Sequence, residues 1–234
     1  MTAPDDIDDL VRRVDPDRWL ASRFAPQGPA RAALVALYAL NHELAHAAEA
    51  ASQPLIGEMR LAWWREALEE LFDGKPPRAH PTAQALAAAV RAGVPREPLD
   101  GLAEARLRDL DGWPLGAGEV EPYIDATTGR LMATAARVLA PDADPHAVRG
   151  AARAWGLAGL FRLGRLPADW PVEEIMAKVD AAVAASRSEL KRLPVGAFPA
   201  VAYAALARPY AAGRAMSELG KRARMTLSVA SGRI

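Results

Sequence analysis

The sequence predicts an all-α protein organised as one helical bundle, and three observations lead to this prediction. Alanine is the most frequent residue and aromatic residues make up only 6% of the chain, which favours helices because Ala and Leu lose little side-chain freedom there. No stretch alternates apolar and polar residues over the length of a strand. With 234 residues, 51% of them hydrophobic, the chain is long enough to bury one core, so we expect a single domain over 1–234.

Prolines mark the starts of the predicted helices, because proline suits the first turn of a helix. Pro16, Pro29, Pro54 and Pro81 each begin a block of helical composition. Together with the glycine and proline clusters that end such blocks, they predict helices over 5–14, 16–25, 29–51, 54–73, 81–92, 97–111, 119–140, 145–163, 171–192 and 197–230, with the last one broken at Pro209.

The helix predicted over 54–73 carries apolar residues over a wide arc. One stripe holds Leu61, Trp64, Leu68 and Leu71, and an adjoining stripe holds Ile56, Met59 and Trp63. A helix that is apolar over such an arc needs neighbours on more than one side, so we expect it near the centre of the bundle. Arg60 lies among these residues and either points into a cavity or extends along the surface to reach solvent.

The charges exclude one class of function and distinguish the two ends of the chain. The 29 basic residues balance the 29 acidic ones, which argues against a general nucleic-acid binder. The N-terminus is acidic, whereas the segment 208–234 is a basic tail. The acidic residues are Asp5, Asp6, Asp8 and Asp9, and the tail holds Arg214, Lys221, Arg222, Arg224 and Arg233 against Glu218. Such a tail is typical of a solvated helix end or of a surface that contacts an anionic membrane.

The absence of cysteine excludes disulfides, thiolate catalysis and cysteine-ligated metals. The first residues lack the basic and apolar regions of a signal peptide. No apolar run approaches the roughly 20 residues that a transmembrane helix needs. We therefore expect a cytoplasmic protein, with peripheral contact to the inner membrane as an alternative.

A zinc-site pattern occurs in the helix predicted over 29–51. His42, Glu43 and His46 form H-E-x-x-H, which places two histidines on one helix face and a carboxylate beside them to activate a metal-bound water. Glu49 is a conceivable third ligand, as are the glutamates at 66, 69 and 70. A zinc hydrolase is therefore one alternative. The other is that both histidines are partly exposed polar residues on an alanine-rich helix, since the chain offers no strand against which a peptide substrate would bind.

Several segments, in order along the chain, resemble the squalene/phytoene synthase family. They are Asp17-Arg18-Trp19-Leu20 with the residues up to Pro26, then 31–41, 57–65, 123–132 and 156–162. The resemblance extends over about 15–169. The segment 41–45, Asn-His-Glu-Leu-Ala, followed by Gly-x-x-Arg-x-x-Trp-Trp over 57–64, is similar to a branch that includes an assembly factor of respiratory complex I.

The resemblance implies an all-α isoprenoid (terpenoid) synthase fold with a central cavity, shortened at the C-terminus relative to active members. Active members join two prenyl diphosphates head to head, and two Asp-x-x-x-Asp sites on facing helices hold Mg²⁺. The i, i+4 spacing places both carboxylates of a site on one helix face. The metal ions offset the charge that develops on the departing diphosphate.

The chain departs from this pattern at both acidic sites. The first aligns with 45–49, where Ala45 stands at the leading position and only Glu49 keeps a carboxylate. The second should follow Arg162, but Leu163-Gly164-Arg165-Leu166-Pro167 comes directly after it. We therefore expect a catalytically degenerate member that needs no cofactor. The resemblance suggests that it binds a prenyl or lipid ligand or supports a membrane-complex protein partner during assembly.

The alternative is a prenyl diphosphate transferase that recruits Mg²⁺ through Glu49 and other acids. Its site would be lined by Tyr38, Asn41, Glu49, Arg60 and Arg162, with the arginines on diphosphate. Glu121 and Asp125, four residues apart in the helix predicted over 119–140, either face a cavity in that case or are ordinary acids in the first turn of a helix.

Overall fold

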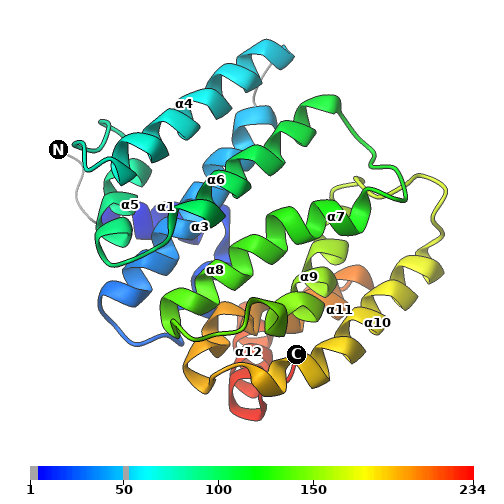
Figure 1. Cartoon of the computed structure of the whole chain (residues 1–234). Helices are drawn as coiled ribbons and strands as arrows, with labels where there is room; N and C mark the ends of the chain where they lie inside the picture. The colour runs from blue at the N-terminus through cyan, green and yellow to red at the C-terminus, as the bar shows by residue number, and fades with distance from the viewer. Residues whose placement is uncertain (1–4, 50–52) are drawn as a thin grey trace. The chain divides into compact units, whose positions relative to one another are not determined.

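The structure, a computed structural model, describes residues 5–49 and 53–234 and is helical throughout, with no strand in those residues (Figure 1). The all-α prediction is therefore confirmed. Contacts along the chain group into two compact units, Met1–Gly112 and Trp113–Ile234. The prediction of one domain over 1–234 stays a prediction. The side chains of Asp5 and Asp6, and the predicted helical residues Ala50 and Ala51, lie outside the described part.

The first unit consists of short N-terminal helices, two long helices and a smaller group that follows them. Its elements are α1 (Asp5–Val14), α2 (Pro16–Ser22), α3 (Pro29–Glu49), α4 (Pro54–Phe72), α5 (Pro81–Arg91), α6 (Arg96–Ala105) and the 3₁₀ helix η1 (Arg106–Asp111). Prolines begin α2, α3, α4 and α5, as predicted.

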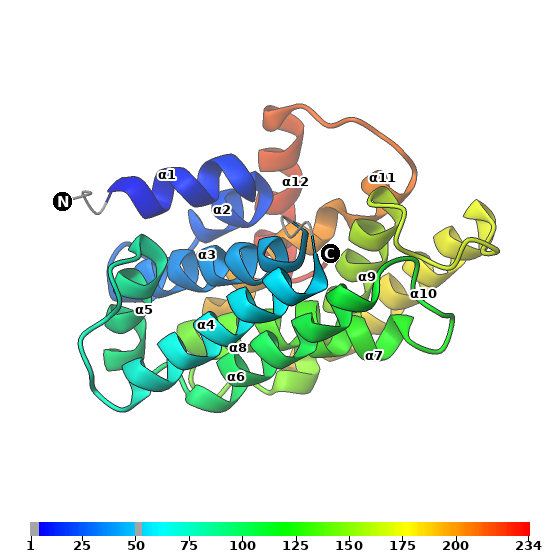
Figure 2. The same ribbon diagram turned by 90° about the horizontal axis from the view of Figure 1, so that it is seen from above.

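Helix α3 forms the centre of this unit. All eight residues over 33–40 are buried, on every side of the helix. Helices α1, α2, α4, α5 and α6 and η1 contact α3 (Figure 2). The alanines at 33, 36 and 39 leave little side-chain volume, which allows neighbours to approach from several directions.

Helix α4 covers one side of α3, which corrects the prediction that α4 is the central helix. Its stripe of Leu61, Trp64, Leu68 and Leu71 is buried as predicted. In the adjoining stripe, however, Met59 is 64% exposed and Ile56 and Trp63 are only half-buried, so that stripe is not a core face. A wide apolar arc does not by itself place a helix at the centre, because a surface helix tolerates single exposed apolar residues.

The second unit follows the same pattern of one central helix. Its elements are α7 (Val120–Ile124), the π-helical turn η2 (Asp125–Gly129), α8 (Arg130–Leu139), η3 (Pro145–Val148), α9 (Arg149–Arg162), α10 (Val172–Glu189), η4 (Leu190–Arg192), η5 (Val195–Ala200), η6 (Ala202–Leu206), α11 (Ala207–Ala211) and α12 (Glu218–Ser231). Helix α9 contacts α7, α10 and α11 and the turns η2, η3 and η6.

Two glycines allow these close contacts of α9. A Cβ added at Gly156 would lie 2.5 Å from the side chain of Ile124 in α7. A Cβ added at Gly150 would lie 2.7 Å from the backbone nitrogen of Ser186 in α10. Both distances are shorter than atoms tolerate, so α9 packs through its own backbone at these points.

The last predicted helix differs most from the structure. The segment 195–206 forms 3₁₀ turns rather than α-helix. The predicted break at Pro209 is wrong, because Pro209 lies inside the first turn of α11, where its missing N–H is not needed. The chain instead leaves the helix over 212–217, where Gly213 adopts a positive φ of 66°. Within the described residues, no helix has the length and apolar character needed to cross a membrane.

Candidate functional site

One face of α3 carries the residues that the family resemblance selects. Tyr38, Asn41, His42, Ala45 and Glu49 lie at i, i+3, i+4, i+7 and i+11, so they line one side of the helix. Tyr38 is fully buried and Glu49, near the end of the helix, is exposed. The face therefore runs from the core to the surface and offers one carboxylate, Glu49, where the family pattern has two.

A buried charge network contacts this face. Arg106 of η1 donates from Nη2 to the amide oxygen of Asn41 at 3.1 Å and from Nη1 to Asp109 at 3.1 Å. Arg106 is 9% exposed and Asp109 is 7% exposed. A charge buried this deeply is tolerated only with partners, so Asn41 helps to hold the arginine in place. Sequence analysis missed this network; the only signal was an arginine and an aspartate three residues apart in a predicted helix.

The two histidines of the H-E-x-x-H pattern lie together, but no third ligand joins them. The rings of His42 and His46 stack with centroids 5.6 Å apart. Over 5–49 and 53–234, no group of three or more histidine, aspartate or glutamate side chains is arranged to hold a metal ion. Of the conceivable third ligands on α4, Glu66 and Glu70 bind Arg78 at 2.9 and 2.7 Å.

Arg60 and Arg162 have different surroundings. Arg60 is exposed on α4, so it is not held among the apolar residues of that helix. Arg162, in the last turn of α9, places its guanidinium 4.3 Å from the ring centroid of Tyr210. This contact has the geometry of a cation–π interaction. The grouping of Tyr38, Asn41, Glu49, Arg60 and Arg162 around one ligand stays a prediction.

The backbone ends α9 immediately after Arg162. The N–H of Gly164 donates to the carbonyl of Phe161 at 3.0 Å, and the N–H of Arg165 donates to that of Leu160 at 2.9 Å. With a φ of 65° at Gly164, these bonds form a Schellman motif. The helix therefore stops where the resemblance expects the second acidic site, and the residues that follow carry no carboxylate until Asp169.

The acids at 121 and 125 are engaged by an arginine. Arg153 of α9 donates from Nε and Nη2 to the two carboxylate oxygens of Asp125 at 2.9 and 2.7 Å, and contacts Glu121 at 2.5 Å. The hydrogen bonds that Arg153 donates to Asp125 raise the pKa of Arg153 above its ordinary value. Arg153 lines a cavity of about 260 Å³ with Trp170 and Lys178. Glu121 lines the same cavity, which is the first of the two alternatives for this acid pair, and both acids bind Arg153, which connects α9 to the helix that begins at Val120.

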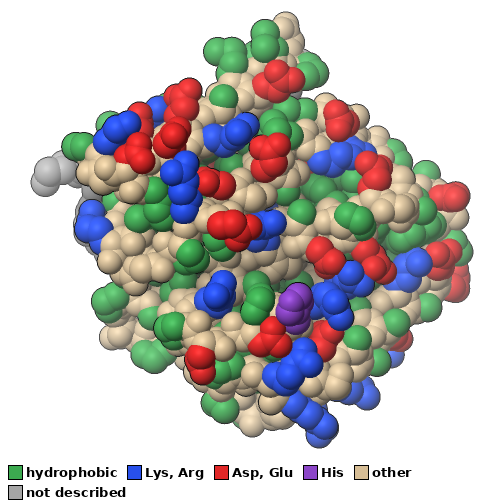
Figure 3. All heavy atoms as spheres, in the orientation of Figure 1, with side chains coloured by type: hydrophobic (Ala, Val, Ile, Leu, Met, Phe, Trp, Pro, Cys, Tyr) green, Lys and Arg blue, Asp and Glu red, His purple; other side chains and the backbone are tan. Residues whose placement is uncertain are grey.

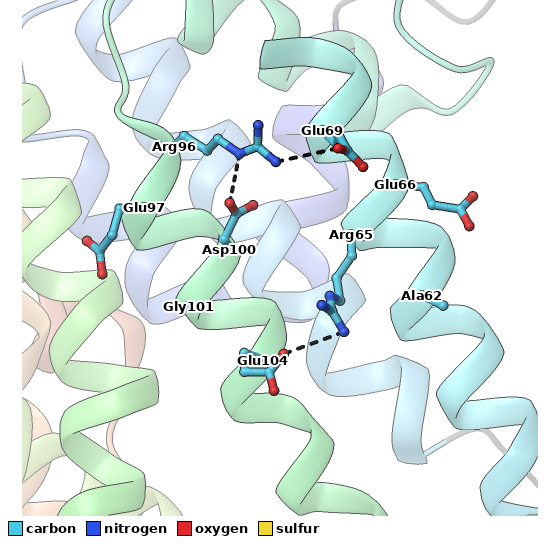
Figure 4. Close-up of a pocket in the computed structure, with 9 residues that line it drawn as sticks. All are labelled: Ala62, Arg65, Glu66, Glu69, Arg96, Glu97, Asp100, Gly101 and Glu104. Atoms are coloured by element: carbon cyan, nitrogen blue, oxygen red, sulfur yellow. Dashed lines mark hydrogen bonds and ion pairs between the residues drawn. The ribbon is translucent and has the colours of Figure 1, made fainter. Parts of the chain in front are cut away.

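An open groove of about 890 Å³ runs between α4 and α6 (Figure 4). Arg65 faces Glu104 across it at 3.5 Å, and Arg96 contacts Asp100 at 2.8 Å and Glu69 at 4.0 Å. The hydrogen bond that Arg96 donates to Asp100 raises the pKa of Arg96. Acidic and basic side chains alternate over this face (Figure 3). The pairs Arg65–Glu104 and Arg96–Glu69 connect the two helices across the groove, whereas Arg96–Asp100 lies within α6. The two pairs between helices were not predicted from the sequence, because their members are 39 and 27 residues apart.

Comparisons with known proteins match this chain to one family. The family model for squalene/phytoene synthase matches residues 11–163. The rat protein "NADH dehydrogenase (ubiquinone) complex I, assembly factor 6" is 33% identical over 133 residues, which is 56% of this chain and 39% of that protein. The human protein of the same name is 27% identical over 125 residues, 53% of this chain and 37% of the relative. The matched region thus spans about two fifths of these relatives.

Solved structures show the same fold. A dehydrosqualene synthase crystallised with a ligand superposes with a TM-score of 0.74 at 12% identity, over 97% of this chain and 95% of the other. The squalene synthase HpnC from Alicyclobacillus acidocaldarius gives a TM-score of 0.67 at 17% identity, over 98% and 94% of the two chains. The fold is therefore of the isoprenoid synthase type, as the resemblance implied.

Proposed function

Because the chain belongs to the squalene/phytoene synthase family, we propose that it is a non-catalytic member that assists assembly of a respiratory membrane complex of the NADH dehydrogenase type. Two observations taken together carry the proposal. The chain matches complex I assembly factors in sequence, and it lacks the paired acids at both places where the family pattern has them.

The α3 face offers few ligands for a metal ion. Mg²⁺ keeps most of its waters and is normally held by several carboxylates together with phosphate oxygens. Ala45 supplies no ligand, and Glu49 is one exposed carboxylate near a helix end. The donor set on this face therefore does not fit a cluster of metal ions on a diphosphate.

The end of α9 departs from the family pattern at the second acidic site. The Schellman motif at Gly164 turns the chain away from the helix, so no further turn exists on which a second pair of acids would face a substrate. Loss of most metal ligands removes several kcal/mol of stabilisation of the departing diphosphate, which corresponds to a rate loss of roughly thousands-fold or more.

The assembly role is tested by genetics in the source organism. We expect deletion of the gene to lower the amount of assembled NADH dehydrogenase complex on native gels, together with membrane NADH–quinone activity. The wild-type chain and Glu49→Ala should restore both to the same level, because the role needs no metal ligand. Normal complex levels in the deletion strain would overturn the assembly role, and rescue by wild type alone would overturn its non-catalytic character.

A further inference from the structure

Helix α12 (Glu218–Ser231) is a well-defined helix that packs through a narrow face. Ser217 caps its N-terminus by accepting a hydrogen bond from the N–H of Gly220 at 3.1 Å, and Gly232 ends it with a φ of 68°. It contacts η5 and η6 of the second unit, and a loop over 212–217 connects it to α11 (Figure 2). Met225 and Ser228 are its buried residues. Gly220, Lys221 and Val229 are half-buried, and the other residues of the helix are exposed, so the side of α12 away from Met225 is available for another contact.

The side opposite Met225 is apolar and uncovered. Leu219 is 77% exposed and Leu227 is 67% exposed. Ala223 and Ala230, also exposed, lie between and after them at i+4 and i+11, so the four residues form one stripe along the outer side of the helix. Two leucines in solvent on one helix face form a small continuous apolar surface.

Cations flank this stripe on both sides. On the helical projection, Arg222 lies on one side of the stripe and Arg224 on the other, with Arg214 before the helix and Arg233 after it. All four are exposed, and within the described part of the chain none of them forms an ion pair. The single acid of the helix, Glu218, is bound to Lys221 at 3.1 Å.

Several arginines elsewhere in the second unit are paired with an acid. Arg153 binds Asp125, Arg208 binds Asp180 with two hydrogen bonds of 2.6 and 3.0 Å, and Arg192 contacts Asp144 at 3.3 Å. Arg137 on α8 and Arg187 on α10 are exposed and form no ion pair within the described residues, but each stands on a separate helix. What distinguishes α12 is that its arginines lie beside one apolar stripe.

From these observations we infer that the outer face of α12 docks on an anionic lipid surface. A helix lying in the membrane interface inserts its apolar side among the headgroups, while arginines beside it reach lipid phosphates with their guanidinium groups. The leucine stripe of α12 supplies the apolar side, and the arginines on either side of it supply the cations for lipid phosphates. This inference is independent of the proposed function, because it concerns a different surface and needs no statement about catalysis.

A protein partner fits the face less well than a membrane does. The core of a protein interface is depleted of charge and enriched in aromatic side chains. The stripe on α12 contains no aromatic residue and has cations along both edges. Nucleic acid would be attracted by the arginines but gives no reason for exposed leucines.

Vesicle flotation of the full chain tests the inference. We expect binding to vesicles of phosphatidylcholine mixed with phosphatidylglycerol, little binding to phosphatidylcholine alone, and a decline as salt is raised from about 0.05 to 0.5 M. Leu219→Gln/Leu227→Gln should weaken binding about tenfold, and so should Arg222→Gln/Arg224→Gln. Circular dichroism should show both variants folded, since all four side chains are exposed.

Matched controls come from other exposed positions. Arg137→Gln/Arg187→Gln removes the same charge, and Leu163→Gln/Val172→Gln removes comparable apolar surface, both away from α12. These variants should bind as the wild type does. Equal loss of binding in the arginine control, or equal binding to neutral vesicles, would overturn the inference. It would also be overturned if the leucine variant bound vesicles normally but changed the molecular mass in solution, which would assign the face to a second copy of the chain.

Discussion

The α3 face and the end of α9 are the two places where family resemblance puts acidic sites, and they depart from that pattern in different ways. On α3 the helix continues through the site, with Ala45 at the leading position and a carboxylate at Glu49. At the end of α9 the backbone differs, because the helix stops in a Schellman motif at Gly164. A point substitution can return a carboxylate to α3, but no point substitution returns a helical turn to α9.

The two regions also depend on different interactions for stability. The α3 face is held from one side by a buried charge network, Asn41–Arg106–Asp109. Helix α9 is held by close backbone approach at Gly150 and Gly156. Side-chain substitutions should therefore have their largest effect near α3, and added methyl groups should have theirs on α9.

The largest effect is expected from Arg106→Met. The substitution removes the contact of 3.1 Å between Arg106 and Asp109, whose side chain is 1% exposed. We expect a loss of about 3–5 kcal/mol in the free energy of unfolding, measured by urea denaturation. Arg137→Met, at an exposed position on α8, is the control and should change stability by about 0.5 kcal/mol or less. Similar stability of the two variants would show that the network does not hold the α3 face.

Gly150→Ala should destabilise the second unit through overpacking. The new Cβ would meet the backbone nitrogen of Ser186 at 2.7 Å and the carbonyl oxygen of Ala182 at 2.9 Å, and backbone atoms cannot rotate away. A loss of about 1–3 kcal/mol is expected in the same denaturation experiment. Gly159→Ala, where no atom lies within 4 Å of the new Cβ, should instead stabilise the helix by about 0.5–1 kcal/mol. If Gly150→Ala and Gly159→Ala changed the free energy of unfolding equally, the close approach of α9 to α10 would be contradicted.

Gly164→Ala tests the end of α9 itself. The residue has a φ of 65°, a region that alanine adopts at a cost of roughly 1–2 kcal/mol. Part of this cost is offset because alanine also restricts the unfolded chain. We therefore expect a net loss near 1 kcal/mol, smaller than at Gly150, because open space surrounds the position. A variant as stable as wild type would indicate that the helix end is not fixed by this glycine.

The smallest effect is expected from Glu70→Gln on α4. A hydrogen bond from Arg78 lowers the pKa of Glu70 below its ordinary value, so the ionised form is favoured in the folded state. Its contribution to stability is therefore present at neutral pH and is lost as the pH falls through the folded-state pKa. The difference between wild type and Glu70→Gln should be measurable at neutral pH and should vanish in acid once Glu70 is protonated in the folded state. A difference that grows in acid would contradict the assigned interaction.

The starts of the helices along the chain were more predictable from the sequence than the contacts that the helices make with one another. Pro16, Pro29, Pro54 and Pro81 begin helices because a proline at the first turn loses no hydrogen bond, and this rule is local. The sequence did not reveal that α3 is the central helix, because alanine is common both on exposed and on buried helix faces. The 3₁₀ turns over 195–206 were not predicted either, because their geometry depends on the elements that pack against them.

The candidate site was predictable only where it depends on single positions. Ala45 and the short connection after Arg162 are visible in the sequence as departures from a pattern. The partners of charged groups are not visible in the sequence, because Asn41 and Arg106 are 65 residues apart and Asp125 and Arg153 are 28 residues apart. Such pairs form only when the fold brings their helices together.

The most direct test of the account is diphosphate release by the purified full chain. Incubation with farnesyl or geranylgeranyl diphosphate and Mg²⁺ should give no release above that of buffer, and Ala45→Asp should give none either, because α9 still ends at Gly164. Release by the wild-type chain that needs Mg²⁺ and disappears in Glu49→Ala would contradict the non-catalytic assignment.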